Sequence, residues 1–118
     1  MNRVTIWHNP RCSKSRTAMQ ILEEQNCEIE IIKYLDTNPD ENQIKAILKM
    51  LGITPRELMR QKETIYKEMN LKEENSDDAL ISAMANYPKL IERPIIVKDG
   101  HAIIGRPTDK IVEFLGQE

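Results

Sequence analysis

The chain contains few cysteines, glycines and aromatic residues. Its two cysteines, Cys12 and Cys27, lack the paired spacing and the histidine partners of a zinc site, and they are too few for a disulfide framework. One Trp, three Tyr, one Phe and four Gly form neither a base-stacking platform nor a glycine-rich nucleotide loop. We therefore expect no bound metal and no bound cofactor, and we expect any thiol chemistry to depend on a single cysteine.

The chain also lacks an excess of charge of one sign and any long apolar run. Lys and Arg total 17 against 19 Asp and Glu, and the net charge of -2 argues against a nucleic-acid binder that neutralises phosphates. Neither a membrane-spanning run nor a signal-peptide hydrophobic region is found. We expect a cytoplasmic monomer with no nucleic-acid or membrane partner, and the 118 residues suit one domain.

The first third of the chain has the pattern of a βαβ unit. Residues 4–7 are β-prone, residues 13–25 carry apolar side chains at helical spacing, and residues 28–35 again favour a strand. A parallel return of the second strand to the first would complete the unit.

The last quarter of the chain returns to strands after Pro94. Asp99-Gly100 separates two short apolar stretches and is a strong signal for a two-residue hairpin with a type I′ turn. A final helix is expected to begin near Pro107-Thr108 and to end at Gly116.

A helical insertion is expected between these parts, at approximately residues 38–91. Asn38, Thr54 and Ser76 each have the features of a helix N-cap, and proline follows the first two at the first helical position. The order βαβ, helical insertion, ββα is that of a thioredoxin-like fold. The pattern by itself supports an α/β protein with one mixed sheet, as a single domain over residues 1–118.

Cys12 lies where the first strand gives way to the first helix. The unpaired amides and positive dipole end of that helix would favour a thiolate over a thiol. Arg11, Lys14 and Arg16 occupy the same turn, and their charges would attract an oxyanion. The alternative is that Cys12 is a buried spacer beside a solvated helix start, since free cysteines are usually buried. The local residues leave both interpretations open.

Four segments together resemble a known family. Residues 8–16, His-Asn-Pro-Arg-Cys-Ser-Lys-Ser-Arg, resemble the active-site segment of the glutaredoxin-coupled arsenate reductases. Residues 58–60, 92–95 and 105–107 resemble the other three signature segments of that family, in the same order and with similar spacing. The chain is therefore identified as a member of the shorter group of ArsC-like proteins, and the resemblance covers nearly its whole length.

The resemblance implies a substrate and a set of roles. Cys12 would attack the arsenic of arsenate, while Arg60, Arg93 and Arg106 would hold the oxyanion. Arginine suits this role because its planar fork makes paired hydrogen bonds to oxyanions and stays charged. Any one of these arginines alone is better explained as a surface ion pair. In the implied cycle glutathione attacks the adduct as co-substrate, and glutaredoxin reduces the resulting mixed disulfide.

His8 is expected to be a second catalytic residue, and three further residues, Ser15, Arg16 and Pro94, are expected to have supporting roles. In the resembling family a histidine at the place of His8 helps to keep the thiol ionised, although a structural role would have the same sequence signal. Ser15 replaces the second cysteine of a dithiol oxidoreductase, and its hydroxyl would either bond the thiolate or face solvent. Arg16 would add positive charge. Pro94 is expected to follow a cis bond, by analogy with thioredoxin-like folds.

Cys27 is a poor candidate for the thiol that resolves an adduct on Cys12. A helix between them would separate the two residues by on the order of 20 Å at about 1.5 Å per residue. A disulfide requires Cα atoms within about 7 Å. Cys27 is therefore expected to be a packing or surface residue, and the reductant to be external.

Other functions fit part of the pattern. Redox regulators of the Spx type share the layout, but they generally use a Cys-x-x-Cys switch whose second position is here Ser15. A monothiol exchanger of disulfides would need Cys12 but neither Arg60 nor Arg106. A cysteine phosphatase would require five residues between its cysteine and arginine, whereas Arg16 follows Cys12 after three.

Overall fold

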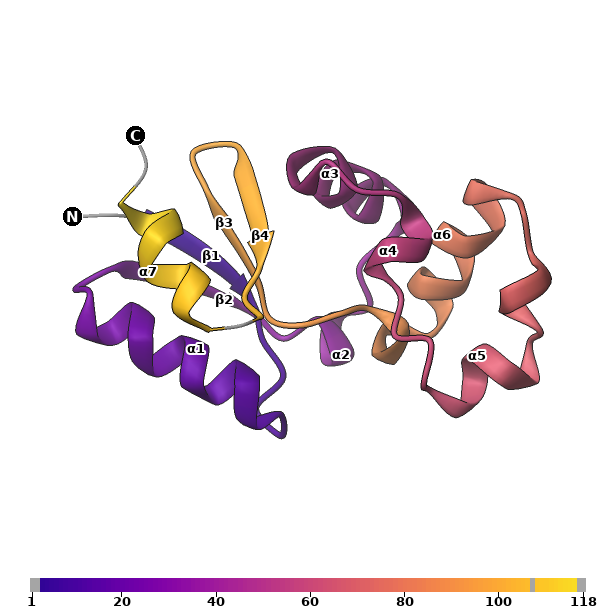
Figure 1. Ribbon diagram of the computed structural model, residues 1–118, viewed down its shortest axis with the longest axis horizontal. Coiled ribbons are helices and arrows are strands. Elements are labelled where there is room, and N and C mark those ends of the chain that lie inside the picture. Colours follow the sequence, from indigo (N-terminus) through magenta and orange to yellow (C-terminus); the bar gives the residue numbers. More distant parts are fainter. Residues whose placement is uncertain (1–2, 107, 117–118) are drawn as a thin grey trace. The chain divides into compact units, whose positions relative to one another are not determined.

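The computed structural model describes residues 3–106 and 108–116, and the chain divides into two compact units (Figure 1). The first unit joins Met1–Tyr34 to Arg93–Glu118 and contains the β-sheet, whereas the second, Leu35–Glu92, is helical. The helical insertion expected at approximately residues 38–91 falls within this second unit. Pro107, at which the last helix was expected to begin, lies outside the described residues. In the described part of the chain, no helix has the length and apolar character needed to cross a membrane.

The first unit is built on a mixed four-stranded sheet of order β2-β1-β3-β4. The strands are β1 (Arg3–Trp7), β2 (Glu28–Ile32), β3 (Ile95–Lys98) and β4 (His101–Ile104). β1 pairs in parallel with β2 and antiparallel with β3, which pairs antiparallel with β4. This confirms the α/β class with a mixed sheet, and it places the end of β1 beside the start of β3.

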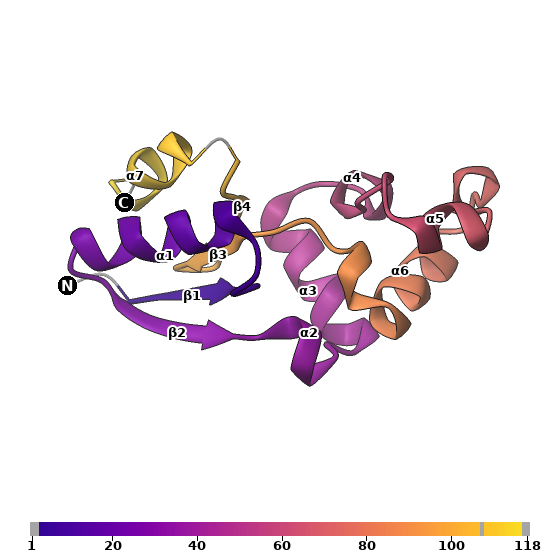
Figure 2. The same cartoon turned by 90° about the horizontal axis from the view of Figure 1, so that it is seen from below.

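Two helices, α1 (Ser13–Glu24) and α7 (Asp109–Leu115), lie on the same face of this sheet (Figure 2). Their apolar side chains join those of the strands in one buried cluster, which comprises Val4, Ile6, Ala18, Leu22, Ile96, Ile111, Phe114 and Leu115. Burial of this cluster stabilises the unit because each fully buried aliphatic side chain contributes about 1.5–3 kcal/mol. The packing fixes the direction of α1, and therefore of the turn at its start.

The hairpin turn is confirmed, and the end of the second strand is corrected. Asp99 and Gly100 have φ values of 51° and 78°, as a type I′ turn requires. β2 ends at Ile32 instead of reaching residue 35, and Tyr34–Thr37 forms the short helix α2. The Tyr34 ring is buried and stacks on Trp7, the last residue of β1, with 6.2 Å between ring centroids.

The second unit contains α3 (Glu41–Leu51), α4 (Pro55–Leu58), α5 (Thr64–Glu68) and α6 (Asp77–Asn86), with two 3₁₀ turns, η1 (Leu71–Glu73) and η2 (Pro88–Leu90). Thr54 and Ser76 cap α4 and α6 as expected. The expected cap at Asn38 is wrong, because Asp40 caps α3. Its carboxylate accepts from Gln43 N at 2.8 Å, and the Gln43 side chain accepts from Asp40 N at 2.9 Å.

Sequence patterns did not indicate α5, which depends on a contact made across many residues. The Arg56 guanidinium donates to Tyr66 Oη at 2.7 Å and to Leu71 O at 3.1 Å, and it also donates to Glu74 O. These bonds hold the segment of residues 64–74 around one arginine.

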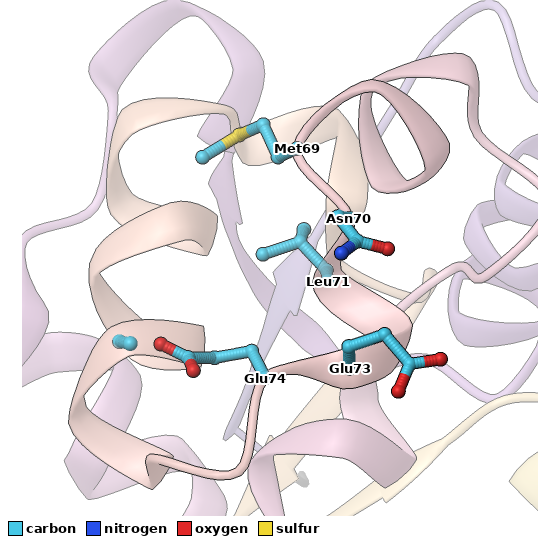
Figure 3. Close-up of a pocket in the computed structure, with 6 residues that line it drawn as sticks. Met69, Asn70, Leu71, Glu73 and Glu74 are labelled. Atoms are coloured by element: carbon cyan, nitrogen blue, oxygen red, sulfur yellow. The ribbon is translucent and has the colours of Figure 1, made fainter.

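A cavity of about 320 Å³ lies beside this segment (Figure 3) and is lined by Met69, Asn70, Leu71, Glu73, Glu74 and Ala79. The Met69, Leu71 and Glu74 side chains extend to one side, whereas Asn70 and Glu73 point the opposite way. Because its polar groups do not converge on one point, this cavity lacks the arrangement of a catalytic site.

We expect Gly105→Ala to destabilise the fold. A Cβ at this position would lie 3.1 Å from Pro94 Cγ and 3.1 Å from Ile111 Cδ1, so the proline ring and the buried Ile111 side chain would both have to shift. Overpacking of this kind costs about 1–3 kcal/mol in the free energy of unfolding. Gly116→Ala is the matched control, because its nearest neighbours would be 3.6 Å away. Urea titration of both variants measures the difference, and equal stabilities would contradict the close packing.

Candidate active site

Cys12 is the N-cap residue of α1 and has extended backbone angles, with φ -93° and ψ 123°. Its side chain is 8% exposed. Within the described chain, no side chain caps α1 and its first turn has no acidic residue, in contrast to the capped helices α3, α4 and α6. The first amides of α1 are therefore available to an anion placed beside the Cys12 sulfur.

Hydrogen bonds hold the loop before Cys12 in a tight turn. Asn9 accepts twice, at O from Cys12 N and at Oδ1 from Arg11 N, both at 3.0 Å. The Arg16 guanidinium donates to Pro10 O at 3.0 Å, so this arginine supports the turn. His8 N continues the pairing of β1 with β2 by donating to Ile32 O at 2.8 Å. The sulfur is thus presented by a turn anchored to both α1 and the sheet.

The structure brings Arg106 to Cys12 across 94 residues of sequence. Arg106 Nη2 donates to Cys12 Sγ at 3.4 Å, and Nε donates to Arg93 O at 2.8 Å. The hydrogen bond to Arg93 O orients the guanidinium, so that its positive charge lies beside the Cys12 sulfur. A guanidinium in this position stabilises a negative charge on sulfur or on a group bound to it.

Arg93 and Pro94 lie at the entrance to β3. The Arg93-Pro94 peptide bond is cis, as expected, and Gly105 N donates to Pro94 O at 2.8 Å. Among the described residues, the buried Nε of Arg93 has no hydrogen-bond partner. A buried donor of this kind is unfavourable unless a ligand accepts from it, which is the property expected of an oxyanion-binding arginine.

Ser15 does not face solvent, and within the described part of the chain its hydroxyl makes no hydrogen bond to the Cys12 sulfur. It is fully buried, its Oγ lies 2.7 Å from His8 Nδ1, and it accepts from Asn9 N at 3.0 Å. Of the two expected alternatives, the solvent-facing hydroxyl is therefore wrong, and the hydrogen bond to the Cys12 sulfur is not present among the described residues. Burial lowers the pKa of His8, and the positive charges of Lys33 and Arg16 lower it further. These effects favour the neutral imidazole over the imidazolium.

Arg60 lies in the second unit, after α4. The backbone of residues 58–60 pairs with that of residues 90–92 through a bridge between Met59 and Ile91. Arg60 Nη1 is 2.5 Å from Glu63 Oε1, and Arg60 Nε is 3.8 Å from Glu92 Oε1. Sequence analysis did not single out either glutamate. The spacing of three residues between Arg60 and Glu63 was the available signal for the first ion pair.

Cys27 and Cys12 are both free cysteines, and the full length of α1 lies between them in the chain. Burial raises the pKa of the Cys27 thiol, and this effect outweighs the opposing charge of Lys98. Cys27 is therefore a weaker nucleophile than an ordinary thiol at neutral pH. Within the residues described, no group of three or more His, Cys, Asp or Glu side chains is arranged to hold a metal ion.

Comparison with known proteins gives consistent matches over nearly the whole chain. The model of the ArsC family matches residues 7–114. The Escherichia coli (strain K12) protein YfgD, described as uncharacterized, is 50% identical over 116 residues, which are 97% of this chain and 98% of YfgD. An arsenate reductase of Neisseria meningitidis serogroup A is 48% identical over 117 residues, 98% of this chain and 100% of that protein.

A solved structure agrees with these matches. The arsenate reductase from Vibrio cholerae superimposes with a TM-score of 0.93 at 48% identity, covering 97% of this chain and 98% of that one. The mixed sheet, with a cysteine at the start of α1 and a cis-proline before β3, defines a thioredoxin-like protein. The chain belongs to the ArsC family.

Proposed function

We propose that this protein reduces arsenate to arsenite with Cys12 as the nucleophile. The observation that carries the proposal is the hydrogen bond from the Arg106 guanidinium to the Cys12 sulfur, which lies at the start of α1 where no side chain caps the helix. A thiolate, a fixed positive charge and free helix amides together suit an attack on a tetrahedral oxyanion. Relatives about half identical to this chain are named arsenate reductases, which supports the same substrate.

Substrate binding would use donors that the first unit already presents. The buried Nε of Arg93 lacks a partner among the described residues, and an arsenate oxygen would accept from it. Arg106 and the first amides of α1 would bind further oxygens as charge develops on them. The family resemblance assigns Arg60 to the same oxyanion, and that assignment remains a prediction.

The first chemical step joins sulfur to arsenic. The Cys12 thiolate attacks arsenic(V), a sulfur–arsenic bond forms, and one arsenate oxygen leaves as water after taking up protons. Arg106 stabilises the thiolate before the attack and the arsenate oxygens after it, without having to move far from the sulfur. The product is a covalent adduct on Cys12 in which arsenic is still pentavalent.

The second step requires an external thiol, for which we propose glutathione. The glutathione sulfur loses its proton and bonds to the Cys12 sulfur of the adduct, and the sulfur–arsenic bond breaks with its electron pair left on arsenic. Arsenic is thereby reduced, arsenite leaves, and Cys12 and glutathione form a mixed disulfide. Glutaredoxin then reduces this disulfide and restores the Cys12 thiol. In total, arsenate and two thiols give arsenite, a disulfide and water. Cys27 lies beyond the far end of α1 and has a raised pKa, and it is therefore not assigned the resolving role.

The direct test is arsenite production from arsenate by the purified protein, with glutathione and glutaredoxin present together and with each omitted in turn. Activity that needs both thiol reagents supports the full cycle. Activity with glutathione alone would remove glutaredoxin from it. Reduction of a glutathionylated protein without any arsenite production would overturn the proposal in favour of a monothiol exchanger.

A further inference from the structure

The contact between His8 and Ser15 is not used in the proposed cycle. The two side chains meet at the start of the site, with His8 Nδ1 and Ser15 Oγ 2.7 Å apart. Ser15 is 0% exposed and His8 is 8% exposed, so solvent has little access to the pair. A short polar contact in such a place restricts which atom carries the shared proton.

The hydrogen bonds available to Ser15 Oγ identify the atom that carries the proton shared with His8. A serine hydroxyl has one proton and two lone pairs. Asn9 N donates to Ser15 Oγ at 3.0 Å and thereby occupies one lone pair. The hydroxyl proton then needs an acceptor, because water does not reach a fully buried oxygen. Among the described residues, His8 Nδ1 is the acceptor within hydrogen-bond distance.

We propose that Ser15 is a positioning residue that donates its hydroxyl proton to His8 Nδ1 and holds the imidazole in the neutral tautomer with its proton on Nε2. The consequence of this tautomer for catalysis rests on the proposed function. His8 then serves the site as a hydrogen-bond donor through Nε2, while Arg106 supplies the positive charge beside the sulfur.

A proton on His8 Nδ1 is less favourable, because it would leave the Ser15 hydroxyl without an acceptor. If His8 carried a proton on Nδ1, as a neutral tautomer or as an imidazolium, Ser15 Oγ would accept from both His8 and Asn9 N. The hydroxyl proton would then lack an acceptor in a buried place. An imidazolium would also be opposed by the positive charges of Lys33, which follows β2, and of Arg16 on α1.

The assignment predicts what His8 can do in the reaction. With Nδ1 occupied by Ser15, the ring has no lone pair left to act as a base towards Cys12. The Nε2 proton remains available to a water molecule, to an arsenate oxygen or to the sulfur. His8 would therefore assist the thiolate by donating a hydrogen bond and not by accepting its proton.

The test is nitrogen NMR of the full chain labelled with ¹⁵N-histidine, which does not depend on arsenate activity. The sequence has two histidines, and the exposed His101 is assigned by its loss in His101→Gln. At neutral pH we expect His8 to show one protonated nitrogen, Nε2, and an unprotonated Nδ1 shifted far downfield. A protonated Nδ1, in either the neutral or the charged form, would overturn the proposal even if the protein reduces arsenate.

Ser15→Ala tests the serine itself, with Ser13→Ala as the matched control on an exposed position of the same helix turn. Loss of the hydroxyl donor should let His8 populate both neutral tautomers, and arsenite production should fall several-fold through kcat more than through KM. Ser13→Ala should change neither. An unaltered His8 spectrum in a folded Ser15→Ala protein would remove the role from Ser15. If Ser15→Ala does not fold, the wild-type spectrum still decides the tautomer.

Discussion

Cys12→Ser should reduce arsenite production to the uncatalysed background. A serine hydroxyl is a far weaker nucleophile than a cysteine sulfur, and Arg106 would then face a hydroxyl oxygen in place of the sulfur. Loss of a covalent nucleophile lowers turnover by roughly 10⁴-fold or more. The substitution keeps nearly the same size at the start of α1, so the fold should be unchanged. Arsenite quantified over time in the complete glutathione and glutaredoxin assay measures the effect.

Cys27→Ser provides the matched control, because it removes the other thiol of the chain. We expect this variant to keep most of the wild-type activity, since Cys27 has a raised pKa and is placed beyond the end of α1. Loss of activity in Cys27→Ser would contradict the external reductant. Equal activity in Cys12→Ser and the wild type would exclude Cys12 as the nucleophile.

Arg106→Ala is expected to give the second largest loss of activity. It removes a charged donor to the Cys12 sulfur and at the same time leaves Arg93 O without its partner. A charged hydrogen bond contributes about 1.5–3 kcal/mol, which corresponds to a decrease in kcat/KM of roughly 10- to 150-fold. Steady-state kinetics with arsenate as the varied substrate measure this decrease in kcat/KM.

Arg106→Lys separates the charge from the shape of this side chain. A lysine would restore part of the positive charge but could not bond the sulfur and Arg93 O at once, because it lacks the planar fork. We expect its activity to lie between that of Arg106→Ala and that of the wild type. Full activity in Arg106→Ala would mean that the contact with Cys12 has no part in the reaction. A melting curve for each variant distinguishes lost function from lost structure.

Several local features could be predicted from the sequence. The caps at Thr54 and Ser76 and the turn at Asp99-Gly100 were identified correctly. Each depends on hydrogen bonds or backbone angles set by residues within a few positions of one another. The same principle produced an error at Asn38, which precedes a proline as an N-cap does but does not cap the helix. Asp40 caps the helix because Gln43 completes its capping box.

In the candidate site, too, some features could be predicted from the sequence and others could not. The position of Cys12 at the start of a helix follows from its neighbours, and the three arginines were found through the family resemblance. The contact between Arg106 and Cys12 was not predictable from local sequence, because the residues lie 94 positions apart. It exists because β1 pairs with β3 and β3 with β4, which brings the ends of these strands together. The ion pair of Arg60 with Glu92 likewise depends on the pairing of residues 58–60 with residues 90–92, whereas the pair with Glu63 is local.

The sequence alone therefore determined the α/β class, the hairpin turn, the helix start at Cys12 and the caps of α4 and α6, since these depend on short-range hydrogen bonding and on the spacing of apolar residues. Only the tertiary structure decided which groups meet the sulfur and which atoms of His8 and Ser15 face each other. Those contacts are set by strand order and by the packing of α1 on the sheet, which no short segment of the chain encodes.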